Sequence, residues 1–393
     1  MSDSVIVPRK YLSIHSWPLV SAGYLVGYVF LDWASYLYPF ASFGITPWNP
    51  SAGLSFALVL LRGRRYLPLL AVGPVLADLL VRRWPLPPGV ELGVGMVNLV
   101  AYGTVLWLLT SPSARFDASL PTMRDLLALL GAGCTGAVLA ALGIVAILAL
   151  GDQLSWSSFA GAALRQWVGD VIGIAVVASC LLLIVTGRLP KERRGEFALH
   201  LLATLSAVAA FFSAEANSHL QLFYILFLPT IGLALRFGLE GVSPGLLLTQ
   251  VALVVGMWST GETAGNVTAY QVRVLVLAIT GLVMGAMVSW QRTTDLRLRQ
   301  QQEALARAGR ISSMGEIAAS IAHELNQPLG ALATYTHLIK RQLDNPEFDR
   351  MIVKEAAAKA VTQTERAAHV VRRLRDMIRL EAADVAPYPL SEL

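Results

Sequence analysis

Residues 126–150 read LLALLGAGCTGAVLAALGIVAILAL and carry no charged side chain. A helix of this length is longer than ~30 Å, the thickness of the hydrocarbon core of a bilayer. Runs of similar character lie at 17–40, 48–62, 66–81, 89–110, 160–186, 197–213, 220–235, 241–259 and 270–290. With 55% hydrophobic and only 15% charged residues in 393, the chain is predicted to be an all-α, polytopic membrane protein with eight to ten spans.

Basic residues flank these runs unevenly, which predicts the topology. If the runs cross the membrane one after another, most of the basic residues between them fall on the same side of the membrane. These residues are Arg9/Lys10, Arg62/Arg64/Arg65, Arg115/Arg124, Arg188/Lys191/Arg193/Arg194, Arg236 and Arg292. Because basic loops face the cytoplasm, we expect a protein of the inner membrane with both termini, including the segment 1–16, in the cytoplasm. Arg82 and Arg83 are the exception. The net charge of +5 is attributed to these loops, which contact membrane lipids, so a nucleic-acid partner is rejected.

The composition changes near Trp290, after which the chain is rich in Ala, Arg, Glu and Gln. Residues 17–290 are therefore assigned to the membrane domain, 291–310 to a linking helix, 311–382 to a helical hairpin and 383–393 to a linker. The turn of the hairpin is predicted at Asp344-Asn345-Pro346-Glu347, and apolar periodicity resumes at Met351. The first helix is expected to run from the last span to about Leu343 without interruption.

A heptad pattern in this first helix predicts how the hairpin assembles. The core positions are Ala318, Leu325, Leu332 and Ile339 in one set and Met314, Ile321, Pro328, Tyr335 and Gln342 in the other. Two helices cannot enclose so broad an apolar seam, so two hairpins are predicted to pair into a four-helix bundle, which makes the protein a homodimer. On this register His323 points away from the seam and into water.

His323 lies in the run Ser320-Ile321-Ala322-His323-Glu324-Leu325-Asn326-Gln327-Pro328-Leu329. A neutral imidazole is a nucleophile near pH 7, so it can accept a phosphoryl group and pass it on. Glu324 is the adjacent carboxylate that could assist as acid or base, although neighbouring residues lie ~100° apart on a helix. The alternative is a solvated surface histidine without a function. His337 and His369 are interpreted as surface or interface residues of the bundle.

Two motifs carry the resemblance of this region to a known family. Ser313-Met314-Gly315-Glu316-Ile317-Ala318 and His323-Glu324-Leu325-Asn326-Gln327-Pro328-Leu329 resemble the phosphoacceptor box of sensor histidine kinases, the HisKA domain. The resemblance implies that His323 is phosphorylated, that Glu324 assists, and that a response-regulator aspartate is the next acceptor. Many relatives carry Thr or Asn four residues after the histidine to position water for dephosphorylation. Here Gln327 takes that place and Asn326 precedes it, which puts phosphatase activity in doubt.

The membrane part resembles a second family, the MASE1 sensory domains, which occur attached to different output enzymes. The resemblance rests on Trp48-Asn49-Pro50-Ser51-Ala52-Gly53, Gly63-Arg64-Arg65-Tyr66-Leu67-Pro68, Trp167-Val168-Gly169-Asp170-Val171-Ile172-Gly173 and Ala234-Leu235-Arg236-Phe237-Gly238. Trp48 and Trp167 in these motifs are taken as sensing candidates.

Asp78 and Asp170 are carboxylates within apolar runs, where a charge is costly and usually faces a cavity or a partner. Arg165, five residues earlier, is a possible counter-ion for Asp170. Both carboxylates could equally serve only to tie helices together. If Asp170 senses the stimulus, its replacement by alanine abolishes signalling and leaves membrane insertion intact. The sequence predicts no metal or cofactor site.

The resemblances together predict a membrane sensor of a two-component system, a protein-histidine kinase. Complete kinases of this type follow the hairpin with an ATP-binding domain that binds ATP and Mg²⁺, whereas this sequence stops at Leu393. The chain alone is therefore expected to be inactive and to need an ATP-binding domain from another chain or a longer parent. The alternative is a transporter-like or ligand-binding membrane protein whose tail is only an oligomerisation coiled coil. The stimulus and the cognate regulator are not predicted.

Overall fold

The computed structural model describes residues 17–36, 46, 48–83, 86–190, 193–213, 222–260, 267–345, 347 and 349–383. Side chains are described for all of these except 260, 267, 268, 310–318 and 377–383. The predicted N-terminal segment 1–16 and residues 384–393 of the predicted linker lie outside this part of the chain.

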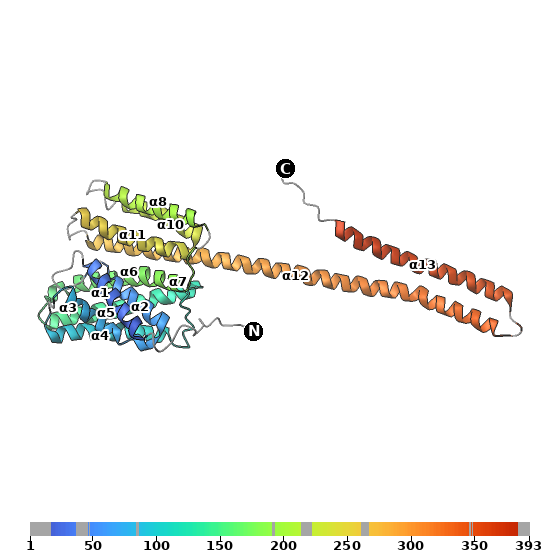
Figure 1. Cartoon of the computed structure of the whole chain (residues 1–393), viewed down its shortest axis with the longest axis horizontal. Helices are drawn as coiled ribbons and strands as arrows, with labels where there is room; N and C mark the ends of the chain where they lie inside the picture. The colour runs from blue at the N-terminus through green and yellow to red at the C-terminus, as the bar shows by residue number, and fades with distance from the viewer. Residues whose placement is uncertain are drawn as a thin grey trace. The chain divides into compact units, whose positions relative to one another are not determined.

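The described residues are helical, and they contain no β-strand (Figure 1). The helices are α1 (Trp17–Ser35), α2 (Pro50–Arg62), α3 (Leu69–Leu80), α4 (Pro88–Leu109), α5 (Met123–Leu150), α6 (Phe159–Gly173), α7 (Ser179–Val185), α8 (Arg194–Ser213), α10 (Phe227–Phe237), α11 (Leu239–Thr260), α12 (Val267–Leu343) and α13 (Arg350–Ala383). The chain forms two compact units, 1–294 and 295–393, and the boundary between them falls within α12. The all-α class is confirmed.

Each of the ten predicted apolar runs contains a helix. Six described helical segments are long and apolar enough to cross a membrane: Pro88–Leu109, Met123–Leu150, Trp156–Val185, Arg194–Ser213, Leu239–Ser259 and Ala269–Gly309. Pro50–Arg62 and Phe223–Phe237 are apolar but shorter. A multi-pass protein is thus confirmed, while the count of eight to ten spans stays a prediction for α1, α2, α3 and α10.

In the first unit, α2 and α6 form the centre. The Asn49 side chain caps α2 by accepting a hydrogen bond from the backbone N–H of Ala52 (3.4 Å), and Pro50 follows at a position that needs no N–H donor. Helix α6 passes into a π-helical turn, η5 (Ile174–Ala178), before α7 begins. A π-helical turn adds a residue to one turn and often marks a functional position. The segment α6–η5–α7 is almost entirely buried, so it forms the core of this unit.

Helices α4 and α5 pack against each other, as do α3 and α4 and α5 and α6, whereas α8 and α10 pack against α11. A Cβ atom added to Gly281 of α12 would lie 2.8 Å from Cγ2 of Thr230 in α10, and one added to Gly285 would lie 2.6 Å from Cγ1 of Val242 in α11. The two glycines therefore allow α12 to pack closely against α10 and α11 within the chain.

The second unit contains the end of α12 and the antiparallel helix α13. The predicted end of the first helix at Leu343 is confirmed, and Asp349 accepts a hydrogen bond from the N–H of Met351 (2.7 Å) at the start of α13. The seam positions whose side chains are described are half-buried at Ile321, Leu325, Leu332, Tyr335, Ile339 and Gln342 and buried at Pro328. The predicted face of the helix is therefore the one that is shielded within a single hairpin. Ala318 and Met314 lie outside the described side chains.

Candidate functional site

His323 lies on the exposed face of α12, as the heptad register predicts. Its Nε2 atom is 3.3 Å from the side-chain nitrogen of Gln327, one helical turn later. Which of the two nitrogens donates depends on the tautomer of the ring, because an imidazole nitrogen accepts only when it carries no proton. The side chain of His323 is exposed, so a partner protein can reach the ring. Asn326 is also exposed, on a neighbouring face.

Glu324 does not contact His323. It accepts a hydrogen bond from Arg373 of α13 (2.8 Å), and both side chains are half-exposed. The separation of adjacent residues by ~100° on a helix explains why the two side chains diverge. An ion pair this exposed contributes little to stability, so Arg373 can release Glu324 at small cost. Arg373 was not predicted, because only the hairpin brings it to Glu324.

A second polar cluster surrounds Asp170, whose side chain is completely buried in the first unit. Its carboxylate accepts hydrogen bonds from the Asn49 amide (2.7 Å), the Tyr102 hydroxyl (2.6 Å) and the Gln166 amide (2.9 and 3.0 Å). These donors come from the cap of α2, from α4 and from α6 itself. The carboxylate therefore ties three helices together, which is one of the two roles that the sequence left open.

The predicted ion pair between Arg165 and Asp170 is wrong. The hydrogen bonds that Asp170 accepts come from neutral donors, and the structure shows no ion pair between the two described side chains. The reason is helical geometry: five residues correspond to ~500° of rotation, so Arg165 lies ~140° from Asp170, whereas Gln166 lies only ~40° away. The Arg165 carbonyl accepts instead a hydrogen bond from Gln271 of α12 (3.2 Å).

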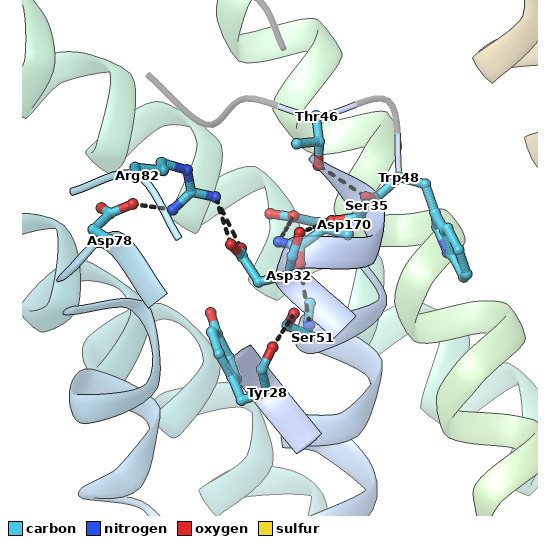
Figure 2. Close-up of polar contacts among 11 residues, drawn as sticks. Tyr28, Asp32, Ser35, Thr46, Trp48, Ser51, Asp78, Arg82 and Asp170 are labelled. Atoms are coloured by element: carbon cyan, nitrogen blue, oxygen red, sulfur yellow. Dashed lines mark hydrogen bonds and ion pairs between the residues drawn. The ribbon is translucent and has the colours of Figure 1, made fainter. Parts of the chain in front are cut away.

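Asp78 forms a different cluster, drawn with Asp170 in Figure 2. Arg82, two residues after the end of α3, donates to Asp78 in α3 and to both carboxylate oxygens of Asp32 in α1 (2.9 Å each). Its guanidinium also lies over the ring of Tyr36, 5.1 Å from the centroid. The side chains of Arg82, Asp32 and Asp78 are all about nine-tenths buried. Arg82, an exception to the basic bias of the loops, is thus a neutralised internal cation.

Trp48 and Trp167 do not join either cluster of carboxylates. Figure 2 shows the Trp48 ring pointing away from Asp170, and its backbone carbonyl accepts a hydrogen bond from Thr46 (2.8 Å). The ring nitrogens of both tryptophans are buried without a hydrogen-bond partner among the described residues. Both rings pack against the apolar core, so the structure supports a packing role for them.

The Asp170 cluster depends on a close approach between α6 and the cap of α2. The N–H of Asn49 donates to the carbonyl of Gly169 (3.1 Å), and a Cβ atom added to Gly173 would lie 1.8 Å from the Asn49 carbonyl oxygen. A Cβ atom on Gly53 would lie 2.2 Å from the carbonyl oxygen of Gly173. Only glycine fits at both positions, because the atoms in the way belong to the backbone and cannot move aside.

We therefore expect Gly173→Ala to lower the free energy of unfolding by about 1–3 kcal/mol, the usual cost of overpacking a core. Thermal unfolding of the purified protein measures this loss. Gly161→Ala is the matched control, because Gly161 lies in the same helix and an added Cβ atom there meets nothing within 4 Å. Equal stability of the two variants would contradict the close approach.

Sequence reasoning identified His323, Asp78 and Asp170 but missed Asn49, Tyr102, Gln166, Arg82 and Arg373. Gln166 could have been predicted from the sequence, since a polar residue four positions before a buried carboxylate lies on the same face of the helix. Asn49 and Tyr102 are 121 and 68 residues away from Asp170 in the chain. No local pattern predicts such pairs.

The comparisons with known proteins agree with both resemblances. Residues 19–292 match the MASE1 family, and residues 313–383 match the His Kinase A (phospho-acceptor) domain. His323 and Glu324 lie within the second match. No solved structure matches the chain.

Curated relatives are sensor proteins of bacteria. The C4-dicarboxylate transport sensor protein DctS of Rhodobacter capsulatus is 40% identical over 95 residues, which are 24% of this chain and 14% of DctS. The sensor protein FixL of Bradyrhizobium diazoefficiens is 37% identical over 103 residues (25% and 20%), and the sensor histidine kinase TmoS of Ectopseudomonas mendocina is 36% identical over 96 residues (24% and 10%). The chain thus aligns with no more than a fifth of the length of these relatives. Since the MASE1 match covers most of the sequence and a phosphoacceptor match follows it, the chain belongs to the MASE1 family and carries a His Kinase A domain.

Proposed function

We propose that this protein is the membrane sensor of a two-component system, in which His323 receives a phosphoryl group from ATP and passes it to an aspartate of a response regulator. The observation that carries the proposal is the exposed side chain of His323 within the phosphoacceptor match. The protein would lie in the inner membrane with both termini in the cytoplasm, as the distribution of basic residues predicts.

The proposed phosphoryl transfer uses the tautomer of the ring in which Nδ1 carries the proton and Nε2 does not. Nε2 attacks the γ-phosphorus of ATP, a P–N bond forms, the bond to the bridging oxygen breaks and ADP leaves. The Nδ1 proton then passes to a base, and Glu324 is the adjacent carboxylate for this role once Arg373 releases it. In the second step a regulator carboxylate attacks the phosphorus and the P–N bond breaks. An exposed ring suits both steps, because two different partners must reach it.

Helix α12 supports a route for the signal. One helix contains both an apolar segment long enough to span the membrane and His323, with no turn between Val267 and Leu343. A shift of the apolar segment can therefore pass along a rigid element. We propose that two hairpins pair through the seam of Leu325, Leu332 and Ile339. These side chains are only half-buried within one hairpin, so a partner hairpin would bury them further.

The test is a fusion of residues 1–383 to the ATP-binding domain of a sensor histidine kinase such as the relative TmoS. Fusion raises the effective concentration of the domain to the millimolar range, so weak docking does not limit the reaction. With γ-labelled ATP we expect label on the fused chain that is lost in acid and retained in base, as for phosphohistidine. A purified response regulator should then remove this label. A fusion that binds ATP but stays unlabelled would favour the alternative, a membrane protein with a coiled-coil tail.

A further inference from the structure

A groove of about 560 Å³ lies between α1 and α3 on the surface of the first unit. Val26, Val29 and Phe30 of α1 form one wall, and Leu76 and Leu80 of α3 form the other. Among the described residues that line it, all are apolar except Arg83, which follows the end of α3. The groove is therefore apolar along its length and has one cationic side chain at its end, which is the arrangement that an anionic amphiphile requires.

The apolar wall faces outward. Val26 is 71% exposed, Phe30 59% and Trp33 62%. A row of such side chains along one helix of a membrane domain fits contact with lipid, because the same surface in water would be an aggregation site. Trp33 is near the end of α1 that precedes Tyr36, where an aromatic ring suits the level of the headgroups.

The two neighbouring arginines differ in what neutralises them. Arg82 is buried between Asp32 and Asp78. Arg83 is exposed and makes no ion pair or hydrogen bond with the described residues. It also adopts a φ of 58°, a left-handed conformation that costs most side chains about 1 kcal/mol, so the chain turns sharply after Arg82. The guanidinium of Arg83 is thus an uncompensated positive charge at the end of an apolar groove.

We propose that this groove binds an anionic phospholipid, with one acyl chain between Val29 and Leu76 and the headgroup phosphate on Arg83. Charge complementarity selects the headgroup, since a zwitterionic lipid offers no net negative charge to the arginine. The apolar walls of the groove favour binding of the acyl chain of the lipid. The site is distinct from His323 and from the Asp170 cluster, and it requires no phosphotransfer activity.

The full chain tests the proposal after reconstitution into vesicles of phosphatidylglycerol and phosphatidylcholine. The protein is extracted in mild detergent, and the retained lipids are measured by mass spectrometry. We expect the share of phosphatidylglycerol among the retained lipids to be about five times its share in the vesicle. This factor is the preference for an anionic lipid that one basic residue near a headgroup produces. Arg83→Gln should return the ratio to that of the vesicle. Arg366→Gln is the control, because Arg366 is also an exposed arginine but lies on α13 in the second unit and does not line the groove.

A second variant distinguishes the contribution of the lipid acyl chain to binding from that of the headgroup. Leu76→Trp fills the groove and leaves Arg83 in place, so it should reduce the retained phosphatidylglycerol although the charge is unchanged. The proposal is overturned if wild-type protein shows no enrichment, if Arg83→Gln keeps it, or if cross-linking shows a second copy of α1 over the groove.

Discussion

Replacing His323 by glutamine should remove all acid-labile label from the fusion of this chain with an ATP-binding domain. Glutamine has about the length of histidine and preserves the helix, but its amide nitrogen holds no free lone pair that can attack phosphorus. The expected effect is a complete loss, since the nucleophile itself is gone. Quantitative autoradiography of the labelled chain measures it, and circular dichroism should show unchanged helix content.

His337→Gln and His369→Gln are the matched controls for this prediction. Both residues are exposed histidines of the same unit, on α12 and α13, and neither lies in the phosphoacceptor box. Both variants should keep the label. Label that persists in His323→Gln but disappears in either control would move the phosphoacceptor to another ring and refute the assignment.

Replacing Asp170 by alanine should lower the free energy of unfolding by about 2–5 kcal/mol. The carboxylate is the common acceptor for Asn49, Tyr102 and Gln166, and its removal leaves three buried donors without a partner. Each such donor costs ~1–3 kcal/mol in a protein interior, with membrane proteins at the low end. Insertion into the membrane should be unaffected, because alanine makes the segment more apolar. Thermal unfolding and the amount of protein in the membrane fraction measure the two effects.

The same substitution should abolish signalling, because α2, α4 and α6 lose their shared anchor. Asp170→Asn should be milder, since one oxygen remains to accept hydrogen bonds. Asp295→Ala is the control: this carboxylate is exposed, and removal of its charge strands no buried donor. An Asp170→Ala protein that unfolds at the wild-type temperature would show that the hydrogen bonds to this carboxylate contribute nothing.

The elements were predictable because they follow from local periodicity. The apolar runs, the end of the first hairpin helix at Leu343, the resumption near Met351 and the exposed position of His323 all depend on residues close together in the sequence. The failure at Arg165 has the same origin. A cation five residues from a carboxylate looked like a partner, but the helix places it on another face.

The partners of the buried charges were not predictable, because hydrogen bonds act over ~3 Å while their two groups can be far apart in the chain. The sequence predicted Arg82 to be a basic loop residue on the side of the membrane opposite to the other basic loops. The structure shows instead that it pairs with Asp32 of α1, which is 50 residues away in the sequence. By itself, the sequence determined the helical class, the membrane character and the position of the exposed histidine in its motif, since composition, helical period and a local motif are properties of adjacent residues. Only the packing of the helices decided which donors surround Asp170, which arginine is paired with buried carboxylates and which has no ion-pair partner among the described residues, because those choices depend on which helix faces meet.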